Sequence, residues 1–168
     1  MQVATGLYKE ILKIVKSDEG VSRERVLALL ALMERLLIES TKEEQLVFST
    51  LFARLSYVGH KRQFDKASLE LLHLFRRMAT RMRHGRPYQE GVVELGVKAV
   101  SSLIQLLYGE PIPEAIKVCF PEEDAFVFRI EEGAMTQSVV RVLALRDEPA
   151  HHRLVVIEED APAEERMV

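Results

Sequence analysis

The sequence predicts an α+β fold that is predominantly α, with a five-helix bundle followed by a small antiparallel β-sheet of about three strands. Apolar residues recur at helical spacing from Leu7 to about Tyr108. After Gly109, prolines interrupt the chain, and three runs rich in branched and aromatic residues follow. The 168 residues suit one compact domain, or one domain with a small appendage. We expect three regions: a helical bundle over residues 1–109, a β-rich segment over 110–158, and an acidic tail or linker over 159–168.

The first two helices are predicted from apolar spacing and from one cap. A short first helix carries apolar residues from Leu7 to Val15 and ends near residues 17–20. Ser22 is expected as the N-cap of a second helix that continues to about Ile38. Because apolar residues surround this second helix on almost every side, we expect it at the centre of the bundle.

The third and fourth helices are predicted from residues that favour helix ends. Thr41 followed by Glu44 is a capping-box pattern, which predicts that the third helix starts there. Gly59 is expected to end that helix in the left-handed conformation. Asp65 is expected as the N-cap of the fourth helix, and Gly85 as its end.

The fifth helix is predicted from Pro87, as a first-turn proline, to Tyr108. Gly96 lies near the middle of its apolar arc, where glycine is unfavourable for helix propensity, so we expect a close approach of another helix. A narrow polar strip is expected on the opposite side, made of Glu94, Lys98, Ser101 and Gln105.

Three strands are predicted after Gly109, over residues 125–130, 137–145 and 153–157. A short helical turn is expected before them, over residues 114–118. The simplest pairing is an antiparallel meander. Such a small sheet has two edges, so it is expected to pack on the bundle, to dimerise, or to begin a larger sheet of a longer chain.

Composition restricts the compartment and the partners. Cys119 is the single cysteine, so no internal disulfide can form, and the chain suits a reducing cytoplasm. The longest apolar run, from Val26 to Met33, is much shorter than the roughly 20 residues that a bilayer span needs. We therefore predict a cytoplasmic protein without a membrane contact.

Charge is unevenly distributed. Residues 61–86 contain eight basic and two acidic side chains, whereas the chain from Gly109 onward contains six basic and fourteen acidic ones. On a helical wheel Lys66, Arg77 and Arg81 share an exposed face with His73, whereas Arg76 and Arg83 border the apolar arc. The residues predicted to contact a nucleic acid or another partner are Lys61, Arg62, Lys66, Arg77, Arg81 and Arg86. Two structural alternatives remain: cations near a helix C-terminus offset the helix dipole, and the acidic C-terminal part could dock on this surface.

No catalytic or metal-binding signature is found. Glu70 and His73 have the spacing of half a di-iron motif, but the second motif and the further inward glutamates that such a site needs are missing. The sequence contains no phosphate-binding glycine loop with Lys-Ser/Thr, no nucleophile elbow and no zinc-protease motif. Acidic residues follow Cys119 closely and disfavour a thiolate, so a packed small side chain is expected there. We therefore expect no enzyme activity, no metal and no cofactor.

Two segments resemble a known family. Thr50–Lys61 (TLFARLSYVGHK) and Leu71–Arg77 (LLHLFRR) look like the helical N-terminal region that precedes the motor in some large bacterial ATPases of the superfamily 1 helicase type. The resemblance covers roughly residues 7–158 and includes no motor motif. It implies a non-catalytic accessory domain in DNA or RNA processing, with a protein partner or the rest of a longer chain beside it. The alternative function is a free-standing regulator that binds a small molecule in the interior of the bundle.

Overall fold

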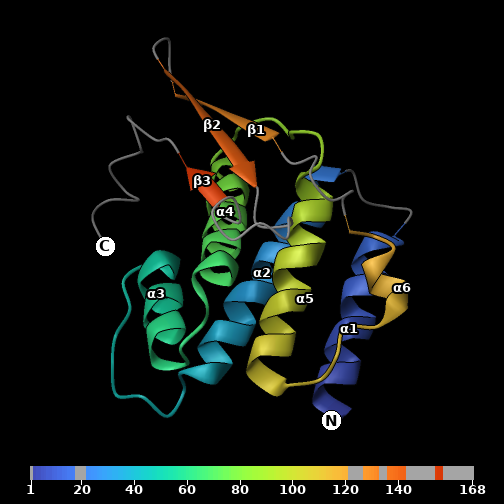
Figure 1. Ribbon diagram of the computed structural model, residues 1–168, viewed down its shortest axis with the longest axis vertical. Helices are drawn as coiled ribbons and strands as arrows, with labels where there is room; N and C mark the ends of the chain where they lie inside the picture. The colour runs from blue at the N-terminus through green and yellow to red at the C-terminus, as the bar shows by residue number, and fades with distance from the viewer. Residues whose placement is uncertain (1, 18–21, 121–126, 133–135, 143–153, 157–168) are drawn as a thin grey trace.

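A computed structural model describes residues 2–17 and 22–120, and beyond them only the backbone of residues 127–132, 136–142 and 154–156 (Figure 1). Helices make up 72% of the first two segments. The six helices are α1 (Gln2–Val15), α2 (Ser22–Ser40), α3 (Leu51–Lys61), α4 (Lys66–Arg83), α5 (Val92–Tyr108) and α6 (Glu114–Lys117).

The core forms around α2, which contacts α1, α3, α4 and α5. Its residues Leu29, Met33 and Leu37 have no exposed surface, so the predicted central position of this helix is confirmed. Figure 1 shows α5 in front of α2, with α1 on one side and α3 and α4 on the other. The short α6 adds the fully buried Ile116 and contacts α1 and α5.

The first helix is joined to a much later part of the chain. The Tyr8 hydroxyl donates a hydrogen bond of 2.8 Å to the backbone carbonyl of Glu110, just after the end of α5. Burial of the phenol and the nearby Glu110 carboxylate raise the pKa of Tyr8, so this hydroxyl keeps its proton and donates.

The predicted fold class needs correction. The sequence predicts five helices, a short helical turn over 114–118 and a three-stranded sheet. Residues 2–17 and 22–120 contain six helices, of which α6 lies at the predicted turn, and no strand. All buried apolar residues that the structure describes lie on helices. The helices therefore close the core by themselves, and the packed part of the chain is all-α rather than α+β.

Three short strands are described by their backbone alone: β1 (Val127–Glu132), β2 (Thr136–Val142) and β3 (Leu154–Val156). Both β1 and β3 pair antiparallel with β2, in the order β1-β2-β3. The register pairs Phe128 with Val140, and Val140 with Val156. β3 contacts α4, and Figure 1 shows the three strands at one end of the bundle. The predicted tail over 159–168 and the outer parts of the predicted strands lie outside the described residues.

The predicted capping box at Thr41 is wrong. Thr41 lies directly after α2, and its hydroxyl donates back to the carbonyl oxygen of Leu37 at 2.8 Å. The N-cap of α3 is instead Thr50, whose hydroxyl accepts a hydrogen bond of 3.0 Å from the Ala53 amide. The third helix therefore begins about ten residues later than predicted, and residues 41–50 form a loop.

Thr50 gives the first testable prediction. Thr50→Ala should destabilise the protein by about 1 kcal/mol, because the Ala53 amide loses its acceptor at the start of α3. Chemical denaturation measures this change. The matched control is Ser49→Ala at the exposed neighbouring position, which should change stability by less than about 0.5 kcal/mol. Equal losses in the two variants would show that the cap is not the cause.

The predictions for helix ends are confirmed at some positions and wrong at others. Gly85 has a φ of 100°, as expected for a helix end, and Asp65 accepts a hydrogen bond from the Ser68 amide as the predicted N-cap. Gly59, however, lies inside α3, where a Cβ atom would come within 2.7 Å of Leu69 on α4. Gly59 therefore allows α3 and α4 to approach closely and does not end the helix in a left-handed turn. Pro87 lies before α5 and not in its first turn, because the N-cap of that helix is Gly91, with a φ of 92°.

Gly96 is confirmed as a point of close approach. A Cβ atom there would be 2.5 Å from Cε1 of Phe75 on α4 and 3.0 Å from Leu29 on α2. Three helices meet at this residue, and the space of a side chain is filled by the Phe75 ring. The expected polar strip of α5 is wrong at Ser101, which is fully buried and donates to the carbonyl oxygen of Val97 at 2.6 Å.

Candidate functional site

A cleft of about 410 Å³ lies between the second half of α2, the start of α3 and the end of α4. Its lining combines apolar, aromatic and strongly basic side chains. The residues are Glu34, Ile38, Phe48, Ser49, Thr50, Leu51, Phe52, Arg54, Arg76, Thr80, Arg83 and His84. We call this set the basic cleft, since it contains three arginines and one carboxylate.

Arg76 is the most enclosed charge of the basic cleft, with only 3% of its surface exposed. Its Nε donates a hydrogen bond of 3.1 Å to Nδ1 of His73, one turn earlier on α4. The guanidinium also lies 5.0 Å from the centroid of the Phe52 ring on α3. A buried guanidinium held in this way has a defined orientation, which is the condition for selective anion recognition.

His73 supports Arg76 as a neutral acceptor. Burial of the imidazole, together with the nearby charges of Arg76 and Arg77, lowers the pKa of His73 to about 3. The hydrogen bond to Nδ1 agrees with this, because only the neutral ring can accept there. Near neutral pH, His73 therefore adds no charge of its own.

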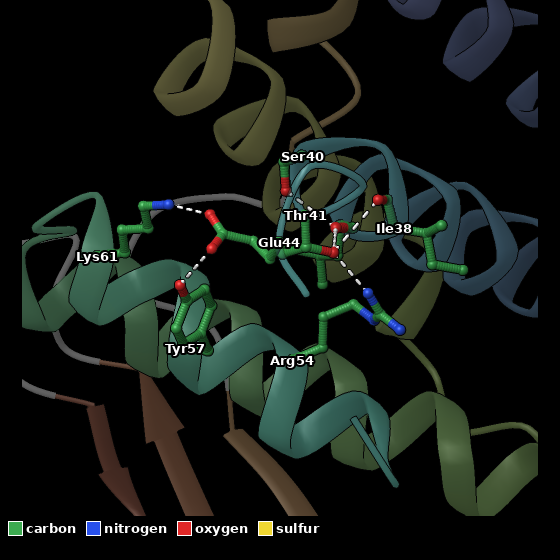
Figure 2. A network of polar contacts seen from close by, with 8 residues as sticks. Ile38, Ser40, Thr41, Glu44, Arg54, Tyr57 and Lys61 are labelled. Atoms are coloured by element: carbon green, nitrogen blue, oxygen red, sulfur yellow. Dashed lines mark hydrogen bonds and ion pairs between the residues drawn. The ribbon is translucent and has the colours of Figure 1, made fainter. Parts of the chain in front are cut away.

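Arg54 is held from the loop that precedes α3. Its Nη1 donates to the Thr41 hydroxyl (Figure 2). Its guanidinium also lies 4.7 Å from the centroid of the Phe48 ring. Thr41 is 4% exposed and neutral. Within the part of the chain that the structure describes, Arg54 forms no ion pair, so the contact with Thr41 orients its charge without neutralising it.

The same loop is fastened to the other end of α3. Figure 2 shows Glu44 between Lys61, which forms an ion pair with it, and Tyr57, whose hydroxyl donates to it at 2.9 Å. The hydrogen bonds from Lys61 and Tyr57 lower the pKa of the Glu44 carboxyl. The Phe48 and Tyr57 rings also pack at 5.2 Å. These contacts keep the loop against α3 and complete the wall of the basic cleft.

The rim of the basic cleft contains one ion pair and one helix start. Arg83 donates to the Glu34 carboxylate at 2.7 Å, and both side chains are partly exposed. Thr50, Leu51 and Phe52 place the first turn of α3 at the rim as well, where the first backbone amides lack intrahelical acceptors. The rim therefore combines a guanidinium with the positive end of a helix.

The residues predicted from the sequence as a partner site do not form one cluster. Lys61, Arg62 and Lys66 are exposed around the start of α4, whereas Arg86 is exposed beyond its end. Lys61 is paired with Glu44, and Lys66 lies 3.8 Å from Glu70. An 18-residue helix is about 27 Å long, so the two groups are far apart.

Arg77 and Arg81 differ from the expectation that they are exposed. Both are half-buried on α4, and both interact with neighbouring groups. His73, expected on the same exposed face, is also half-buried. A helical wheel shows directions around one helix but not the neighbours that cover each direction, and here α3 covers His73 with Phe52 and Ser56.

The sequence alone does not reveal the basic cleft. Arg54 and Arg76 are 22 positions apart, and neither belongs to a recognisable motif. The one available signal for this cleft is the position of Arg76 at the border of an apolar arc, where a side chain can be buried. A buried arginine is rare and indicates a structural or binding role.

The described residues also bear on three other possibilities, which are a metal site, a reactive cysteine and a membrane-spanning helix. In residues 3–17 and 22–120, no three histidine, cysteine, aspartate or glutamate side chains gather as metal ligands would. Cys119 is partly buried, with its sulfur 3.7 Å from the carbonyl oxygen of Ala115. No helix in the described ranges combines the length and the apolar character needed to cross a membrane.

Comparison with known proteins adds no relative: no family model, curated protein or solved structure matches this chain. The function therefore has to be inferred from the sequence and the geometry of this molecule.

Proposed function

We propose that this chain is a non-catalytic accessory or interaction domain that contacts nucleic acid through its backbone phosphates, as the N-terminal part of a larger cytoplasmic nucleic-acid-processing ATPase. The observation that carries this proposal is the exposure of basic side chains at both ends of α4, with Arg62 and Lys66 at one end and Arg86 at the other. The resemblance to helicase-type ATPases supports the same assignment.

The spacing of these charges suits a nucleic-acid strand. One phosphate recurs about every 3.4 Å along a strand, so the roughly 27 Å length of α4 corresponds to about eight nucleotides. Contacts of lysine and arginine with phosphates fix the position of a strand but carry no sequence information, and we propose contacts of that kind for these side chains. Binding should therefore be weak, independent of sequence and sensitive to salt.

Exposed apolar side chains support an interaction domain as well. Leu46 and Val47, in the loop between α2 and α3, are 52% and 98% exposed, and Ile38 at the end of α2 is 51% exposed. Exposed apolar groups of this kind occur at surfaces that contact another protein. A protein partner, or the rest of a longer chain, would cover them.

Charge reversal tests the nucleic-acid contact. The double variant Arg62→Glu with Arg86→Glu should lower affinity for a labelled single strand by at least about tenfold at low salt, because two phosphate contacts become repulsive. Fluorescence anisotropy measures the affinity. If about four phosphates are contacted, the wild-type log-log salt slope should be near about −3, and the variant slope near about −1.5.

The matched control reverses two charges elsewhere. Lys9→Glu with Lys13→Glu changes the net charge equally, but on the exposed face of α1. This control should bind almost as the wild type does. Absence of wild-type binding at about 50 mM salt, or equal loss in both double variants, would contradict a defined contact along α4.

A small-molecule regulator is the second candidate, and the basic cleft favours it. The interior around Gly96 does not offer space for a ligand, because Phe75 and Leu29 fill it. The basic cleft, at about 410 Å³, has the size of common small-ligand sites. A ligand present at about 100 times its dissociation constant should stabilise the fold by about 2.7 kcal/mol, which a thermal-shift screen would detect.

A further inference from the structure

We propose that the basic cleft binds a phosphate monoester group, with Arg54, Arg76 and Arg83 as its ligands. This inference deepens the second candidate function and does not depend on the contact along α4, since Arg62 and Arg86 do not line the cleft. The phosphate could belong to a small organic molecule or to the end of a nucleic-acid strand.

Charge selects the kind of anion. Among the described residues, three arginines and one glutamate line the basic cleft, which gives this set a formal net charge of about +2. A phosphate monoester carries about −1.5 to −2 near pH 7, whereas a carboxylate carries only about −1. The dianion therefore matches the formal charge of this set better than a carboxylate does.

Arg54 and Arg83 have donors for such a group. A guanidinium has five N–H donors in a planar fork that fits phosphate oxygens. One donor of Arg54 is used on a neutral hydroxyl, and one donor of Arg83 is used on Glu34. Arg76 is kept in place by His73 and by the Phe52 ring. The positive end of α3 at Leu51 adds to the same field.

The size and the walls point to an organic phosphate. A volume of about 410 Å³ lies within the range of pockets that hold small organic ligands. Ile38, Phe48 and Leu51 supply apolar and aromatic surface beside the arginines. The arginines would hold the phosphate, and this surface would contact the organic part.

Glu34 is the internal competitor for the ligand. Its carboxylate occupies Arg83 at 2.7 Å, and among the described residues it is the only acidic side chain in the lining of the basic cleft. A bound phosphate must share or displace this ion pair. Removing the carboxylate should therefore strengthen binding, which a purely structural role of the cleft does not predict.

Calorimetric titration of the full chain tests the inference. Adenosine monophosphate should bind, and adenosine should bind much more weakly or not at all. Arg54→Gln should weaken binding about 10- to 100-fold, because a hydrogen bond to a charged group is lost. Glu34→Gln should tighten binding several-fold. The matched control is Arg35→Gln, which removes an arginine from a 2.7 Å ion pair with Glu10 outside the cleft and should leave the affinity unchanged.

A second titration distinguishes the sources of the phosphate. Short single strands with a 5′-phosphate or a 5′-hydroxyl are compared in the Arg62→Glu, Arg86→Glu variant, where the proposed contact along α4 is removed. A preference for the 5′-phosphate would identify a strand end as ligand, and binding of the mononucleotide alone would identify a small molecule.

Two results would overturn the inference. One is no heat signal and no thermal stabilisation with adenosine monophosphate, inorganic phosphate or the phosphorylated strand up to about 10 mM, where the binding free energy would be weaker than about −4 kcal/mol. The other is binding that Arg54→Gln and Glu34→Gln leave unchanged. If Arg54→Gln does not fold, the Glu34→Gln titration alone decides, since its expected effect is a gain.

Discussion

Gly96→Leu is expected to destabilise the bundle by about 3 kcal/mol or more, although leucine favours helix formation more than glycine does. The reason is local: even a Cβ atom at this position would lie 2.5 Å from the Phe75 ring, which is itself fully buried. The leucine side chain would push α4 and α5 apart. Chemical denaturation of the variant measures the loss.

Gly6 offers a matched control. It lies within α1, and no heavy atom would come within 4 Å of an added Cβ atom. Gly6→Ala should therefore stabilise the protein by about 0.5 to 1 kcal/mol through helix propensity alone. A Gly96→Leu variant as stable as the wild type would show that α4 and α5 do not meet closely at Gly96.

Acidification is expected to destabilise the fold through His73. The pKa of this imidazole is about 3 in the folded state and 6.5 without the protein environment. Between these values the unfolded state binds a proton that the folded state does not bind, so stability falls as the pH decreases below about 6.5. The slope is about 1.4 kcal/mol per pH unit, which gives a loss of about 2 kcal/mol between about pH 6.5 and 5.

The structural reason is the contact with Arg76. Protonation of Nδ1 would remove the acceptor of the Arg76 Nε and would place a cation beside two guanidinium groups. His73→Gln should therefore flatten the dependence of unfolding free energy on pH between about 6.5 and 5. His60→Gln, at an exposed position on α3, is the control and should keep the wild-type slope. Identical slopes in the wild type and His73→Gln would contradict this prediction.

Local signals predict local features well. Asp65 caps the start of α4 through a short-range hydrogen bond, and Gly85 follows its end with a positive φ. Both roles can therefore be inferred from neighbouring residues. Glycine inside a helix is unfavourable for helix propensity, so its presence at Gly96 needs a compensating contact. Close packing of a neighbouring helix supplies that contact, and the sequence alone therefore indicates it. The central position of α2 follows from its apolar surface.

The failures come from contacts between distant segments. The Thr41 and Glu44 pair satisfies the local pattern of a capping box, but α2 continues to Ser40, and the two side chains bind Leu37, Lys61 and Tyr57 instead. The sequence predicts five helices and a sheet because the apolar pattern does not show which segments close the core. The basic cleft depends on arginines from α3 and α4 meeting, which no single helix pattern contains.

The hydrogen bond between Tyr8 and Glu110 also bears on how the chain folds during synthesis. Its two residues are 102 positions apart, and α1 rests on α5 and α6, the later helices of the bundle. At about 5 to 20 residues per second, a ribosome needs roughly 5 to 20 seconds to extend the chain between them. For most of that interval, from the synthesis of α2 until α5 follows, the apolar surface of α2 lacks its partner α5. The nascent chain is therefore most exposed to aggregation, and most in need of a chaperone, until residue 110 has left the ribosome.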